Sequence, residues 1–149
     1  MKPDWTLIAN ATQARLLQKE PGCPMVVVHA FHHPEGRLKT SELGDDRPGR
    51  EASSQSYGGA TFSAHTDAHR KEHQKFAHEL AQYLEHAAQQ GGFHKLEVFA
   101  SNPFLGEIKE QLGDATRRQL TATHAVDLTA VGLAEIEQRI AHEHAAARP

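Results

Sequence analysis

Cysteine is almost absent from this chain of 149 residues, which contains only Cys23. A single thiol cannot form an internal disulfide, which is typical of a reducing compartment. Long hydrophobic runs are also lacking: the longest, Met25-Val26-Val27-Val28, is far shorter than the roughly 20 residues of a membrane-spanning helix. The first residues lead directly into a strand-like segment without the features of a signal peptide. We therefore expect a cytoplasmic protein with no membrane partner.

The chain also lacks a large excess of charge of either sign. The 16 lysines and arginines against 19 aspartates and glutamates give a formal net charge of −3. This excludes a global basic field that would attract nucleic acid, although a local basic site stays open. The length fits one domain over residues 1–149, and it is too short for two.

Hydrophobic patterning predicts five strands and three helices. The strands are expected at residues 5–9, 15–19, 25–31, 96–100 and 121–128. Helices are expected at residues 66–90, with Thr66 as N-cap, at 103–112, with Asn102 as N-cap, and from a cap at Thr129 to about His144. Three strands joined by short turns, followed by two crossovers, favour an α/β fold with a mixed five-stranded sheet and flanking helices. The ribonuclease-H-like arrangement has this order of elements.

A long connection separates the third strand from the first helix. Between residues 32 and 63 the chain is rich in glycine, carries two prolines and mixed charges, and has few apolar residues. Connections of roughly thirty residues without periodicity are uncommon in compact domains and are usually functional or disordered. We expect a loop that is the most mobile part of the chain.

Several short motifs follow one another along nearly the whole chain. They are Ala9-Asn10-Ala11 before Ala14-Arg15, Asp46-Arg47-Pro48-Gly49-Arg50, His69-Arg70-Lys71-Glu72-His73 before Phe76-Ala77-His78-Glu79-Leu80, Ala100-Ser101-Asn102-Pro103-Phe104-Leu105-Gly106, and Asp127-Leu128-Thr129. In this order they resemble the bacterial host attachment protein family. That resemblance implies a role in attaching bacteria to host cells.

The same family is distantly similar to the middle domain of archaeal and eukaryotic peptide release factors. In that domain a Gly-Gly-Gln loop before a long helix enters the ribosomal peptidyl-transferase centre. Here Tyr57, Gly58 and Gly59 stand in the matching place, but Ala60 replaces the glutamine. Asn10 stands where the family often has aspartate, at the strand end where ribonuclease-H-type nucleases need a metal-binding carboxylate. Both departures argue against the corresponding catalysis.

Histidine is the abundant residue, with 12 in the chain. His65, His69 and His73 are spaced by four, so they share one face of the predicted helix and continue the stripe of Phe76 and Leu80. Two imidazoles at this spacing can chelate zinc or a similar divalent metal, with His65 or a loop carboxylate as third ligand. The alternative is a set of half-buried polar residues that close the core.

Two weaker candidate sites would bind anions. Arg47 and Arg50 flank Pro48-Gly49, where paired guanidinium groups could hold a phosphate or carboxylate. The adjacent Asp45 and Asp46 favour a self-paired turn instead. Asn102 opens a helix directly after a strand, where free N–H groups could bind an anion, but every such junction offers this.

The sequence therefore leaves three hypotheses. The first is a non-catalytic domain that associates with the ribosome or structured RNA, like a release-factor middle domain without its glutamine. The second is a protein-interaction factor in host attachment. The third is a small enzyme that binds a metal through the histidine arc (His65, His69 and His73) or an anion through the arginine loop (Arg47 and Arg50). The sequence favours a non-enzyme without cofactor, and it gives no oligomeric state.

Overall fold

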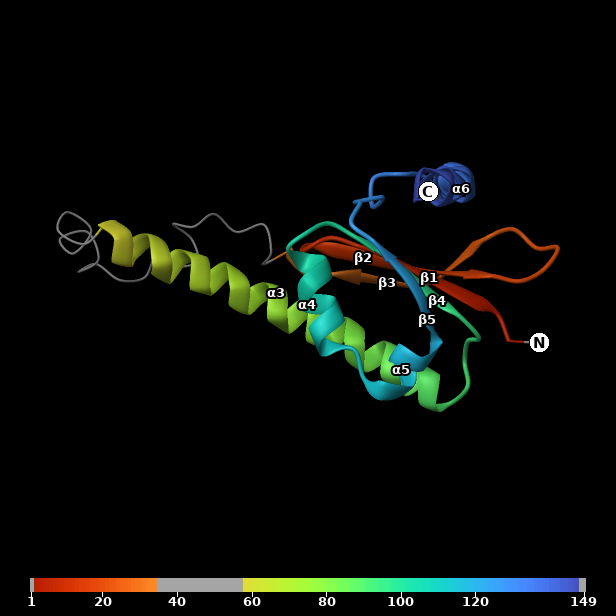
Figure 1. Ribbon diagram of the computed structural model, residues 1–149, viewed down its shortest axis with the longest axis horizontal. Coiled ribbons are helices and arrows are strands. Elements are labelled where there is room, and N and C mark those ends of the chain that lie inside the picture. The colour runs from red at the N-terminus through yellow and green to blue at the C-terminus, as the bar shows by residue number, and fades with distance from the viewer. Residues whose placement is uncertain (1, 35–57, 148–149) are drawn as a thin grey trace.

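The computed structural model describes the backbone of residues 2–34 and 58–147, and the side chains of these residues apart from 58–66 (Figure 1). Arg47, Arg50 and Tyr57 lie outside the described residues, as does most of the predicted loop. The two ends of that prediction are wrong, because residue 32 ends a strand and residues 58–63 are helical.

The first three strands form the predicted antiparallel meander. They are β1 (Asp4–Ala9), β2 (Gln13–Lys19) and β3 (Val26–His32). β1 pairs with β2 from Asp4–Lys19 to Ala9–Ala14, and β2 pairs with β3 on its other side. Gly22 in the second turn has a φ of +78°, a left-handed conformation that favours glycine.

Two parallel strands complete the sheet. β4 (Leu96–Ala100) pairs with β1, and β5 (Leu120–His124) pairs with β4. The strand order is β3-β2-β1-β4-β5, so the predicted mixed five-stranded sheet is confirmed. The fifth strand is shorter than predicted, because β4, its pairing partner, ends at Ala100.

The long helix α3 (Gly58–Gln89) begins earlier than predicted. Gly58 and Gly59 lie in its first turn rather than in a loop, and Thr66 is an internal residue rather than an N-cap. The pattern Thr66-Asp67 is compatible with a helix interior, and no proline interrupts the segment before it. The C-terminal end agrees with the prediction: Gly91 has a φ of +73°, and its N–H donates to the carbonyl of Ala88.

Two short helices connect β4 to β5. In α4 (Phe104–Gln111) Pro103 is the N-cap, without a side-chain capping bond, so the prediction of Asn102 as N-cap is wrong. The N–H of Leu105 donates instead to the carbonyl of Ser101. The other helix, α5 (Asp114–Gln119), was not predicted, because its five polar residues and one alanine carry no apolar stripe.

The last helix, α6 (Leu133–Ala147), starts four residues after Thr129. Thr129 is not its cap, because the hydroxyl of Thr129 donates to Asp127 within the preceding segment. In this helix Ile136 and Ile140 are buried, whereas Leu133 is 40% exposed.

The sheet lies between two helical layers, with α3, α4 and α5 on one face and α6 on the other (Figure 1). Alternate strand positions face each layer, so the core is divided into two clusters. The α3 cluster includes Trp5, Leu7, Leu16, Phe76, Leu80, Val98 and Phe104. The α6 cluster includes Ile8, Leu17, Phe99, Leu128, Ile136 and Ile140. Among the described helices, none is long and apolar enough to cross a membrane.

Candidate functional site

The turn after β1 is organised by the amide of Asn10. Its Oδ1 accepts hydrogen bonds from the backbone N–H groups of Thr12 (2.9 Å) and Gln13 (3.0 Å), which hold the connection to β2. Because these donors fix the oxygen, Nδ2 faces the other way. It donates to Oδ2 of Asp127 and to Oγ1 of Thr129, at 3.0 Å each. One amide therefore joins the β1–β2 turn to the segment after β5.

Asp127 is stabilised as a carboxylate by these contacts. Its Oδ1 accepts hydrogen bonds from the backbone N–H (2.8 Å) and the hydroxyl (2.6 Å) of Thr129. Partial burial, the largest single influence, acts to raise the pKa of Asp127, but the hydrogen bonds from Thr129 and Asn10 together hold the pKa below its ordinary value. The group of Asn10 that faces Asp127 is therefore an N–H donor rather than an oxygen. Because hard cations need oxygen ligands, this arrangement does not suit a cation between positions 10 and 127.

Arg15 anchors the same segment from β2. Its Nη2 donates to the carbonyl oxygens of Leu128 (3.1 Å) and Val131 (2.7 Å). Its Nε is buried and has no hydrogen-bond partner among the described residues. Arg15 thus positions the connection between β5 and α6.

A second polar cluster lies beside the Asn10 turn, on the face covered by α3. His33, directly after β3, donates its backbone N–H to the carbonyl of Thr12 at 2.7 Å. Its Nε2 is 3.0 Å from Oε1 of Glu72, and its ring stacks on Phe76 with centroids 5.1 Å apart. The side chains of His33 and Glu72 are only 14% and 15% exposed, so this ion-pair geometry is largely shielded from water.

His73 extends this cluster along α3. Its ring meets Phe104 of α4 edge-on, with centroids 6.0 Å apart. Burial lowers the pKa of His73, and the neighbouring His69 lowers it further, while Glu107 acts in the opposite direction. The net shift is downward, so His73 is mainly neutral at pH 7 and its imidazole keeps a lone pair.

The structure brings part of the predicted site together. His69 and His73 are half-buried, as the continuation of the apolar stripe predicts, and they join His33 and Glu72 at one edge of the sheet. The side chain of His65 lies outside the described residues, so a metal held by all three arc histidines stays a prediction. Asn102 is exposed, and its predicted anion site also stays a prediction.

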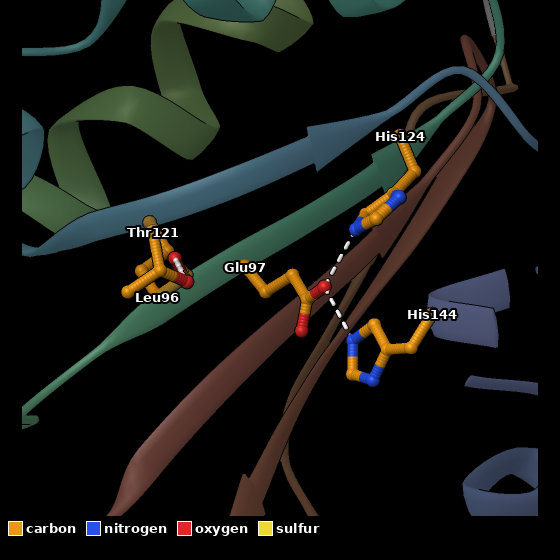
Figure 2. Close-up of polar contacts among 5 residues, drawn as sticks. All are labelled: Leu96, Glu97, Thr121, His124 and His144. Carbon is orange, nitrogen blue, oxygen red and sulfur yellow. Dashed lines mark hydrogen bonds and ion pairs between the residues drawn. The ribbon is translucent and has the colours of Figure 1, made fainter. Parts of the chain in front are cut away.

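Sequence reasoning missed several residues of this edge. His33 and Glu72 are 39 positions apart, and no motif connects them. Asp127 and Thr129 were noted as a motif, but the long-range hydrogen bonds from Asn10 could not be read from spacing. A third polar group, Glu97 with two histidines, lies on the opposite face of the sheet, under α6 (Figure 2).

A family model described as "Protein required for attachment to host cells" matches residues 5–140. The chain belongs to this family. The matched range runs from the second residue of β1 into α6, so it includes nearly the whole sheet, the Asn10 turn and the His33–Glu72–His73 cluster of this host attachment family member. Comparison with curated proteins gives no match.

Proposed function

We propose that this host attachment family member is a non-catalytic binding factor that acts in the cytoplasm on the ribosome or on structured RNA. The projecting N-terminal half of α3 and the adjoining sheet edge would form its contact surface. The observation that carries the proposal is the long helix that extends well beyond the sheet (Figure 1).

The projecting part of α3 is not held by a core of its own. Its described side chains before Phe76 are exposed or only partly buried, with Glu72 and His73 in contact with His33 and Phe104, whereas Phe76, Ala77, Leu80, Ala81 and Leu84 all pack into the α3 cluster. Isolated helical turns are marginally stable in water, because helical stability in proteins comes mainly from packing. A helical arm with so few buried side chains favours a surface that is covered by a partner.

The exposed charges of this arm favour an anionic partner. Arg70, Lys71 and Lys75 are exposed; among the described contacts, Arg70 lies 3.9 Å from Glu107 and Lys75 donates to Glu72 at 3.3 Å. Such surface pairs are worth little and leave the cations available to phosphate. The arm therefore offers the local basic site that a net charge of −3 leaves open.

The topology agrees with the resemblance noted in the sequence. The strand order β3-β2-β1-β4-β5, with only β2 antiparallel to its neighbours, supports a ribonuclease-H-like fold. In the release-factor middle domain that the family resembles, the Gly-Gly-Gln sequence lies in a loop before the long helix. Gly58 and Gly59 match that glycine pair in sequence but lie in the first turn of α3, and Ala60 replaces the glutamine whose amide would position a water molecule. The proposal is therefore binding without peptide release.

A second candidate function is a protein-interaction factor required for attachment to host cells. The description of the family favours it directly. In that case the arm would contact a protein, and its basic residues would recognise an acidic surface rather than phosphate.

One capture experiment distinguishes the two candidate functions. The full chain, with a small affinity tag at its N-terminus, is used to capture partners from native lysate in the presence and absence of ribonuclease. The RNA proposal predicts ribosomal RNA and proteins in the untreated sample and their loss after nuclease treatment. Capture of the same protein partners in both samples would support the second candidate and contradict the first.

A further inference from the structure

Three metal-ligand side chains converge on the face of the sheet covered by α6. They are Glu97 from β4, His124 from β5 and His144 from α6 (Figure 2). The Nε2 atoms of both imidazoles lie 2.6 Å from the same oxygen, Oε2 of Glu97. Among the described residues, no other group of three such side chains brings its ligand atoms within 4.8 Å of one another.

An irregularity in the sheet places His124 on this face. The pairing of β4 with β5 shifts by one residue after Leu96, which leaves Thr121 as an extra residue in β5. The hydroxyl of Thr121 donates to the carbonyl of Leu96 at 3.1 Å (Figure 2). In an unshifted ladder His124 would align with Ala100 and face α3. The shift aligns it with Phe99 instead, so its side chain faces α6.

Packing holds the two imidazoles in place. The ring of Phe99 stacks on His124 with centroids 4.4 Å apart and planes 10° apart, and it lies 6.4 Å from the ring of His144. His144 follows Ile136 and Ile140 at intervals of four, so it continues the buried stripe of α6 toward the sheet. Three separate elements thus direct one donor atom each to one point.

We propose that Glu97, His124 and His144 bind a divalent first-row transition metal ion, with zinc the expected ion. Two imidazoles and one carboxylate are a known zinc donor set, and three protein ligands leave a further position for water or another ligand. The site would fasten the C-terminal end of α6 to β4 and β5. His144 lies outside the residues 5–140 matched to the family, and the inference is independent of the proposed function.

The geometry needs only a small adjustment to admit the ion. A tetrahedral zinc ion with bonds of about 2.0–2.1 Å keeps its ligand atoms about 3.3 Å apart, so each 2.6 Å contact would open by about 0.7 Å. The side chain of His144 is 44% exposed and can move outward, while the contact between His124 and Glu97, which are 14% and 17% exposed, would open by a small rotation of the Glu97 carboxylate.

The contacts have two chemical explanations. Two unprotonated Nε2 atoms would repel the carboxylate, so either both nitrogens carry a hydrogen and donate to Oε2, or a cation lies between the three groups. The first explanation makes the cluster a hydrogen-bonded clamp between α6 and the sheet. The second makes it a metal site, and metal titration separates the two.

The test uses the full chain without a histidine tag, treated with chelator and then titrated with Zn²⁺ in a calorimeter. We expect one Zn²⁺ per chain, and with Co²⁺ the intense visible absorption of a tetrahedral ion. His144→Gln and Glu97→Gln should each weaken binding by more than about 100-fold, beyond the loss typical of a supporting residue. His144→Gln changes a partly exposed helix residue, so its fold should be retained, which circular dichroism verifies.

Two control variants make the assignment specific. His142→Gln removes an exposed imidazole from the same helix, two residues away, and should bind Zn²⁺ like the wild type. His69→Gln/His73→Gln removes two of the three arc histidines of α3 and should also retain the binding. Failure of the wild type to bind stoichiometric Zn²⁺ would overturn the proposal. Unchanged affinity in His144→Gln, or loss of binding in the arc variant, would overturn it equally.

Discussion

The amide of Asn10 offers the sharpest test of the sheet edge. Replacing it by aspartate keeps the oxygen that accepts from Thr12 and Gln13 but removes both N–H donors. The introduced carboxylate would then face Oδ2 of Asp127 at about the 3.0 Å that Nδ2 now occupies. Two like charges in this arrangement repel, and the segment after β5 loses its link to the β1–β2 turn.

The expected cost follows from two contributions. A hydrogen bond to a charged group is worth about 1.5–3 kcal/mol, and two unit charges 4 Å apart repel by about 1 kcal/mol at the dielectric constant of water. Because Asp127 is exposed, we take the lower end and expect Asn10→Asp to lower the free energy of unfolding by about 2–3 kcal/mol at pH 7. The repulsive part should disappear as the pH falls and the carboxylates take up protons.

Urea unfolding between pH 4 and pH 8, in buffer without divalent cations, measures this effect. The matched control is Asn10→Asp combined with Asp127→Asn, which exchanges donor and acceptor and should recover much of the loss. An Asn10→Asp variant as stable as the wild type at pH 7 would refute the reasoning. So would a double variant that is no more stable than the single one.

Three further perturbations test other contacts. Gly113→Ala would put a Cβ 2.5 Å from the carboxylate of Glu85, which now accepts hydrogen bonds from the N–H groups of Ala115 and Thr116. We therefore expect urea unfolding to show that the free energy of unfolding falls by about 1–3 kcal/mol. An equal loss in a Glu85→Ala background would contradict this explanation. The pKa of His73 is lowered in the folded protein, so the unfolded chain binds the proton more readily and wild-type stability should fall as the pH drops below about 6.5. Thermal unfolding of His73→Gln should show a weaker fall. Parallel curves for the two proteins from pH 5 to pH 8 would refute this prediction. Arg15→Lys keeps the charge but loses the guanidinium group that donates to the carbonyls of Leu128 and Val131. Urea unfolding should therefore show a free energy of unfolding lower by about 1–2 kcal/mol. An unchanged urea midpoint would show that these hydrogen bonds do not stabilise the fold.

The sheet could be predicted from the sequence because its strands carry local signals. Short apolar runs bounded by turn residues, such as those before Asn10 and after Pro24, identify strands whatever lies around them. The end of α3 was equally accessible, because Gly91 supplies the left-handed residue that closes it. Membership of the host attachment family was also predicted correctly from the order of its motifs.

The features that were missed depend on residues far apart in the chain. The first turn of α5 is stabilised by Glu85 of α3, about thirty residues earlier, so its own sequence gives little indication of a helix. Likewise, the cluster of Glu97, His124 and His144 depends on the extra residue in β5, because an unshifted strand would direct His124 to the other face. The stripe Ile136, Ile140, His144 was the only local signal for that site.

Binding of purified ribosomes tests the central proposal most directly. Co-sedimentation is measured over a series of salt concentrations for the wild type, for Arg70→Glu/Lys71→Glu on the arm, and for Arg118→Glu/Arg139→Glu, an equal charge change at exposed positions away from it. We expect wild-type binding to weaken as salt rises, the arm variant to lose it at every concentration, and the control variant to bind like the wild type. Absence of wild-type binding at low salt, or equal loss in both variants, would contradict the account.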